Sequence, residues 1–77
     1  MISILNGQVL ELGTESVVVL VGGVGFEVFL PPRQLLQLQV NQEATLHTRM
    51  IVKEDDISLF GFGSKLEREQ FGLLCSV

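Results

Sequence analysis

The sequence predicts one small domain of mostly β structure, a closed barrel of five short strands with a short helix between the third and fourth strands. Three observations lead to this prediction. The chain has 77 residues, which leaves room for a single domain. Hydrophobic residues make up 47% of it and charged residues 18%, a composition typical of a packed globular unit. Five apolar runs are separated by glycine-rich, proline-rich or charged turns, and many short, bent strands favour a barrel, which closes to remove exposed edges.

The first two predicted strands are residues 2–12 and Ser16–Val21. In the first, the apolar alternation is broken around Asn6 and Gly7, where a missing side chain permits a bulge or a sharp bend. We therefore expect one long, curved strand. The second is a β-branched run without alternation, which predicts a central strand covered on both faces. The following pair, Gly22–Gly23, predicts a tight hairpin turn because both residues can take positive φ.

Residues 24–30 form the third predicted strand. Apolar residues alternate there, so the even-numbered side chains are predicted to face the core and Phe29 to face outward. An apolar side chain on the outer face suggests contact with another domain or subunit. Pro31 and Pro32 end the strand because proline has no N–H for the ladder, and Pro32 can open a short helix over residues 32–38.

The last two strands are predicted at residues 43–52 and 57–62, with a charged loop at 53–56 between them. Val52 and Ile57 flank the loop, and we expect them to anchor its base in the core. Five strands in this order, with a helix after the third, fit a five-stranded barrel of the OB type. A small SH3-like barrel is the alternative.

A helix is predicted after the fifth strand, where the apolar period changes. Ser64 followed by Glu67 is a capping box, which places the start of the helix at Lys65. No capping glycine or proline ends this helix within the chain. We therefore expect residues 1–62 to be the barrel domain and residues 63–77 to begin a following helical domain.

Composition argues against several classes of function. Five Lys and Arg against nine Asp and Glu give a net charge of -4, so the chain alone is expected to bind nucleic acid poorly. A single cysteine and the absence of a signal-peptide pattern favour a reducing cytoplasm. The longest apolar run is far shorter than the roughly 20 residues that cross a bilayer, so no membrane segment is expected.

Catalytic and metal-binding patterns are not found in the sequence. His47 and Cys75 lie on different predicted elements, while a structural metal site needs about four ligands, so no metal or other cofactor is expected. His47 is interpreted as a surface residue on the wetter face of its strand. Glu54, Asp55 and Asp56 are clustered carboxylates, but nothing in a polar turn would desolvate them as acid and base roles require. We do not expect an enzyme.

Several short motifs follow one another along the chain: Met1, Ile2, Leu5 and Gly7, then Gly22 to Val28, then Val52 to Asp55 with Leu59 to Phe62, and finally Glu67, Arg68, Phe71 and Leu74. Taken together in their order and spacing, these motifs resemble the N-terminal domain of the RuvA family of Holliday-junction branch-migration proteins. The resemblance spans essentially the whole chain and implies an OB-type barrel, in agreement with the strand count. It also implies a non-catalytic junction-recognition subunit that acts in DNA recombination and repair.

The same resemblance implies a role for the charged loop. Glu54 and Asp55 match the family's acidic pin, which stands near the four-fold axis of a homotetramer and repels phosphates at the centre of the junction. The role passes only weakly to Asp56, where the family pattern is less strict, and Lys53 stands where Arg is common. Implied partners are four-way junction DNA, the RuvB motor ATPase through a later domain, and the RuvC resolvase.

Helix-hairpin-helix motifs, which make most of the family's junction contacts, would follow Val77. We therefore expect this chain alone to bind junctions weakly or not at all. A different class of function is a barrel that serves as a protein–protein assembly module without DNA contact. The net charge of -4 and the outward Phe29 favour that alternative.

Overall fold

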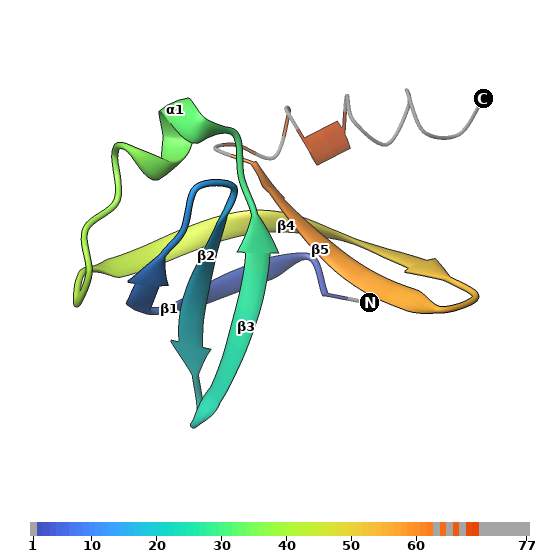
Figure 1. Ribbon diagram of the computed structural model, residues 1–77, viewed down its shortest axis with the longest axis horizontal. Helices are drawn as coiled ribbons and strands as arrows, with labels where there is room; N and C mark the ends of the chain where they lie inside the picture. The colour runs from blue at the N-terminus through green and yellow to red at the C-terminus, as the bar shows by residue number, and fades with distance from the viewer. Residues whose placement is uncertain (1, 63, 65, 67, 70–77) are drawn as a thin grey trace.

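The computed structural model describes residues 2–62, 64, 66, 68 and 69. The strands close into a barrel in the order β1-β2-β3-β5-β4, with β4 returning to β1 (Figure 1). All neighbouring strands are antiparallel except β3 and β5, which are parallel. The predicted five-stranded barrel of the OB type is confirmed. Its elements are β1 (Ile4–Leu12), β2 (Ser16–Val21), β3 (Val24–Phe29), α1 (Pro32–Leu35), β4 (Glu43–Lys53) and β5 (Asp56–Phe62).

Strand β1 is shared between two neighbours, and this sharing curves it around the barrel. Its first half pairs with β4 and its second half with β2. The predicted curvature is confirmed, but the bulge lies between Val9 and Glu11 rather than at Asn6 and Gly7. A Cβ on Gly7 would fall on the Leu20 carbonyl, well inside van der Waals distance. Gly7 therefore permits a close backbone approach by β2 and does not mark a bulge.

The core fills the barrel, and Leu35 of α1 closes one end of it. Alternation along the strands places these side chains inside, because every second residue of a strand points to the same face. The residues with no more than 1% exposure are Val9, Val17, Val19, Val28 and Thr48, and the other buried apolar ones are Leu5, Leu30, Leu35, Ala44, Leu46 and Leu59.

The hairpin of β2 and β3 follows the prediction except at its end. Gly22 and Gly23 both have positive φ, 56° and 84°, as the predicted tight turn requires. Strand β2 is central, but Val18 on its outer face is only half-buried, so that face is partly open. Val24 is 54% exposed and does not join the core, because it immediately follows the turn at the end of the hairpin.

Helix α1 is shorter than predicted. It ends at Leu35 instead of continuing to residue 38. After it, Gln37 and Leu38 donate backbone hydrogen bonds to carbonyls only three residues back, at 3.1 Å each. Such bonds tighten the last turn. The tightening returns the chain to the barrel, where Leu38 packs against the core while Leu36 remains exposed.

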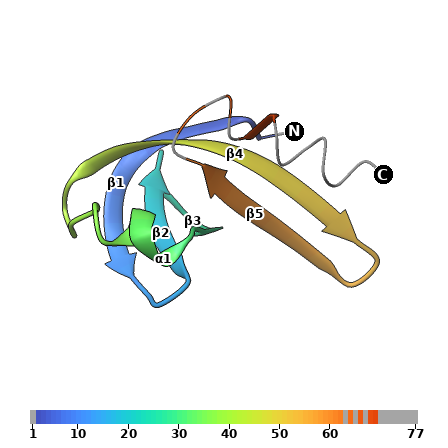
Figure 2. The same cartoon turned by 90° about the horizontal axis from the view of Figure 1, so that it is seen from above.

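Strands β4 and β5 continue beyond the barrel as a two-stranded arm (Figure 2). Strand β5 pairs with β3 only at Leu59 and Phe60. The prediction that Val52 and Ile57 anchor the base of the loop in the core is wrong, since they are 62% and 66% exposed. The alternation of β4 and β5 is regular, but between Leu59 and the turn, β5 no longer pairs with β3, so Ile57 on the inward-facing side stays uncovered.

The chain that follows β5 is described at four positions. Leu66, Arg68 and Glu69 are helical, and the Arg68 N–H donates to the Ser64 carbonyl at 3.2 Å, as a helical turn requires. The rest of the predicted helix, including Glu67 and Cys75, lies outside the described residues. The division into a barrel domain and a following helical domain stays a prediction. Within the described residues, no helix has the length and apolar character needed to cross a membrane.

Candidate functional site: the acidic hairpin

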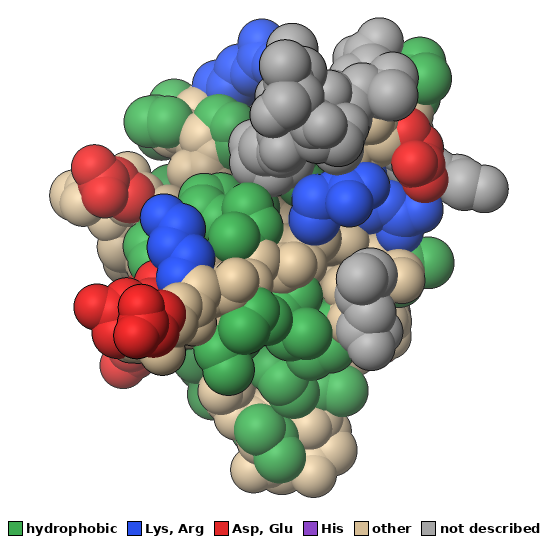
Figure 3. Space-filling model, turned by 90° about the vertical axis from the view of Figure 1, so that its right-hand side faces the viewer, with side chains coloured by type: hydrophobic (Ala, Val, Ile, Leu, Met, Phe, Trp, Pro, Cys, Tyr) green, Lys and Arg blue, Asp and Glu red, His purple; other side chains and the backbone are tan. Residues whose placement is uncertain are grey.

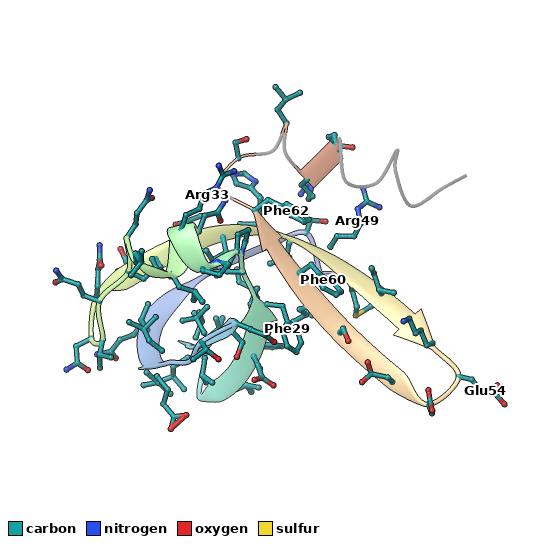
Figure 4. The ribbon with its side chains drawn as sticks, turned by 45° about the horizontal axis from the view of Figure 1, so that its top comes forward. Phe29, Arg33, Arg49, Glu54, Phe60 and Phe62 are labelled. Carbon is teal, nitrogen blue, oxygen red and sulfur yellow. The ribbon has the colours of Figure 1, made fainter. Side chains whose placement is uncertain are left out.

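The acidic residues singled out in the sequence lie at the far end of the β4–β5 arm. A two-residue turn, Glu54–Asp55, joins the strands, and Lys53 and Asp56 form the last cross-strand pair before it. Asp56 is therefore the first residue of β5 rather than part of the loop. Neither turn residue has positive φ, so the turn is not of the primed type that glycine favours. Glu54 points away from the barrel (Figure 4).

The carboxylates of the arm differ in their surroundings. Glu54 and Asp55 are exposed, and among the described residues neither forms a hydrogen bond or an ion pair. Asp56 is exposed as well, but its Oδ2 accepts a hydrogen bond from the Ser58 hydroxyl at 2.7 Å. Lys53 is the cross-strand partner of Asp56, but no ion pair joins the two side chains among the described residues. Glu54 and Asp55 are thus the two carboxylates of the arm without a hydrogen-bond partner among those residues.

This arrangement can repel an anion but offers no enclosed site. The arm is paired without interruption from His47–Phe62 to Lys53–Asp56, so its end projects from the barrel as a regular hairpin. Exposed carboxylates there repel phosphates within about a Debye length, ~8 Å at physiological ionic strength. The described residues contain no group of three or more His, Cys, Asp and Glu that could hold a metal ion.

One face of the arm is apolar, which the sequence analysis missed. Val52 and Ile57 are a cross-strand pair and therefore share that face. Beside them a groove opens where β3 and β5 diverge, and its lining includes Phe26, Met50 and Leu59. Figure 3 shows the side of the molecule toward which the arm extends, with a hydrophobic area next to a group of acidic side chains. Alternation gives no sign of this exposure, because it does not indicate where the barrel ends.

Phe29, predicted to face outward, contacts another aromatic residue of the barrel. Its ring centroid is 5.7 Å from that of Phe60, and the ring planes are tilted by 35° (Figure 4). Such tilted pairs stabilise a fold beyond the area they bury. Phe29 is half-buried, so part of its apolar surface is covered by its own domain.

The outer face of β4 is less wet than predicted. His47 is half-buried rather than a surface residue, and its Nδ1 has no hydrogen-bond partner among the described residues. The same holds for Nε of Arg49. Nη2 of Arg49 lies 4.0 Å from Oε2 of Glu69, so the chain that leaves β5 passes beside this face. No sequence motif indicated that contact.

The fold and the arm together define a class of protein: a small OB-type barrel domain whose distinctive feature is an exposed, negatively charged hairpin and not a pocket. The family model described as the RuvA N terminal domain matches residues 1–61, and the chain belongs to this family.

Three relatives from bacteria are similar over nearly the whole chain, and each is named Holliday junction branch migration complex subunit RuvA. The protein of Beutenbergia cavernae is 43% identical over 77 residues, covering 100% of this chain and 38% of the relative. The protein of Thermobifida fusca is 45% identical over 71 residues, or 92% of this chain and 35% of the relative. That of Renibacterium salmoninarum is 47% identical, covering 100% and 36%. The chain therefore spans little more than a third of the length of these relatives.

Proposed function

We propose that this chain is the barrel domain of a Holliday-junction recognition subunit of a branch-migration complex, and that Glu54 and Asp55 form an acidic pin that repels DNA phosphates at the junction centre. The observation that carries the proposal is the position of these two carboxylates at the end of a paired arm, exposed and without a partner among the described residues. Membership of the RuvA family and the names of the relatives support the general role.

The proposed mechanism is electrostatic and involves no catalytic step. Duplex DNA carries one negative charge per about 1.7 Å of its axis, so a strand that approaches the tip meets like charge. Two unit charges 4 Å apart in water repel by about 1 kcal/mol, and in a homotetramer four tips would add their fields. Duplex arms would then be kept apart, and strands that exchange partners would pass around the tips.

The attractive part of DNA binding would come from elsewhere in a longer protein. With a net charge of -4, this chain as a whole does not attract phosphates. In the RuvA family, by the resemblance given above, later helix-hairpin-helix motifs supply these contacts and a further domain binds the RuvB motor. We extend these partners, the RuvC resolvase and a cytoplasmic location to this protein as part of the proposal.

A second candidate function is an assembly module that does not contact DNA. The exposed pair Val52 and Ile57 favours it, because apolar side chains beside an open groove suit a contact with another protein. The same pair also suits the proposed homotetramer, in which a neighbouring subunit would cover it. The two functions therefore differ in DNA binding and not in assembly.

The full-length protein tests the proposal through the double variant Glu54→Gln with Asp55→Asn. We expect it to bind plain duplex and junction more tightly and to prefer the junction less. A control with Glu11→Gln and Glu43→Gln removes the same net charge from exposed positions away from the arm, and it should keep the preference. Equal preference in the pin variant and wild type would contradict the pin, whereas no junction binding by the wild type would favour the assembly module.

A further inference from the structure

Arg68 ties the chain that leaves β5 back to the start of the barrel. Its Nη1 donates a hydrogen bond to the Ser3 carbonyl at 2.9 Å, and its Nη2 donates to Oε1 of Glu69 at 3.0 Å. Only 12% of the Arg68 side chain is exposed. A guanidinium so far removed from water is stable only where hydrogen bonds to the protein replace those to water.

The acceptor that Arg68 uses is itself held by the barrel. The Thr48 N–H donates to the Ser3 carbonyl at 2.7 Å, and the Thr48 hydroxyl donates to the Ile2 carbonyl at 2.9 Å. Thr48 is 1% exposed and lies in the middle of β4. The two donors to Ser3 use both lone pairs of its carbonyl oxygen. Arg68 therefore binds a carbonyl that is already hydrogen-bonded to β4, although Ser3 lies near the start of the chain.

A second contact holds the same segment from the side. The Glu69 carboxylate lies between two guanidinium groups, with Oε1 3.0 Å from Arg68 and Oε2 4.0 Å from Arg49. It thereby offsets the repulsion between the two arginines. Because Arg49 and Thr48 are neighbours in β4, both contacts fix the departing chain to one short stretch of that strand.

We propose that Arg68 is a positioning residue, which sets the direction in which the chain leaves the barrel and thereby the placement of the acidic tip relative to the part of the protein that follows. Strand β4 links the Arg68 contact to the acidic tip, because it continues from Thr48 to Lys53 at the base of the turn. That distance is about 17 Å at the rise of an extended strand. The geometric half of this inference rests only on the part of the proposed function that makes this chain a piece of a longer protein, and its consequence for junction binding rests on the acidic pin as well.

The geometric half is tested in the full-length protein by spin-label distances. One label is placed at exposed Gln37 on the barrel and one on the part that follows Val77, with labelled subunits diluted in unlabelled ones. Arg68→Ala should broaden or shift the distance distribution, while the barrel stays folded because the Thr48 N–H still satisfies the Ser3 carbonyl. Arg68→Lys should restore the wild-type distance distribution only in part, since an ammonium group cannot reproduce the two simultaneous hydrogen bonds of the guanidinium.

Arg33→Ala is the matched control, because it removes the same charge from an exposed position in α1. An unchanged distribution in Arg68→Ala, or an equal broadening in Arg33→Ala, would overturn the positioning role. A thermal melt of each variant measures whether its barrel is folded.

Junction binding by the same variants tests the consequence. Arg68→Ala should lose preference for junction over duplex, while its affinity for plain duplex stays that of Arg33→Ala. If the distances broaden but the preference is kept, the functional half is overturned. If the Glu54 and Asp55 double variant also leaves the preference unchanged, it is the proposed function that fails, and the distances alone decide the positioning role.

Discussion

The Ser58 hydroxyl donates a hydrogen bond to Oδ2 of Asp56 at 2.7 Å, and this bond distinguishes Asp56 from the two carboxylates before it. It directs the Asp56 carboxylate back along β5, toward the barrel. Lys53 is the cross-strand partner of Asp56 on β4 and also directly precedes Glu54 in the chain, and no ion pair joins it to either carboxylate among the described residues. Glu54 and Asp55 accept no hydrogen bond like that of Asp56 among these residues. The carboxylates of the arm that remain free to act on an approaching phosphate are therefore those of the two turn residues.

A comparison of single variants follows from this difference. In the full-length protein, Asp55→Asn should tighten DNA binding by about 1 kcal/mol, the scale of one close charge pair in water. Asp56→Asn should tighten it by less than half as much, because Asp56 lies farther from the tip and faces a lysine. Fluorescence anisotropy with labelled duplex and junction measures both. Equal gains from the two variants would show that Asp56 belongs to the pin.

The effect of the pin should depend on salt. The affinity gain of the Glu54→Gln, Asp55→Asn variant over wild type should shrink as salt rises, because the Debye length falls from about 10 Å at 0.1 M to about 3 Å at 1 M. A titration of junction DNA at several salt concentrations measures the ratio of the two affinities. A ratio that stays constant would mean that the substitutions act through the shape of the turn and not through charge.

Gly7 supports the curvature that closes the barrel. Gly7→Ala should lower the free energy of unfolding by about 3 kcal/mol, because the added methyl would meet the Leu20 carbonyl, which belongs to backbone and cannot rotate away. Gly25→Ala is the matched control, since Gly25 also lies in a strand, its position is exposed, and the added methyl would meet only a side-chain carbon of Val18 at 3.3 Å, which can shift. Urea denaturation of the chain measures both. Similar losses would contradict a special role for Gly7.

Local patterns were sufficient to predict most of the barrel. The Gly22–Gly23 turn and the buried position of Val28 in β3 follow from residue type and alternation alone. The bulge was misplaced because a glycine in a strand has two physical readings, a bulge or a close approach, and only the passing β2 backbone at Leu20 decides between them.

The candidate site, too, could be predicted only in part from the sequence. Glu54 and Asp55 could be predicted because a charged pair between two apolar runs indicates an exposed turn, and the resemblance to the family gave that turn a role. The hydrogen bond between Arg68 and Ser3 could not be predicted from the sequence, since it joins residues 65 positions apart and no motif marks either partner. The closed barrel as a whole determines which elements lie opposite the arm. The hydrophobic pattern of a single strand does not indicate this.

The apolar pair of the arm should matter only in the assembled protein. Val52→Thr with Ile57→Thr should leave the melting temperature of the 77-residue chain nearly unchanged, because both side chains are already exposed. In the full-length protein, the same variant should weaken assembly by about 2 kcal/mol if a neighbouring subunit covers the pair. Sedimentation equilibrium measures the association. Val24→Thr, at a position 54% exposed on the other hairpin, is the control and should assemble as wild type does. Unaltered assembly of the double variant would mean that no subunit covers the apolar face of the arm.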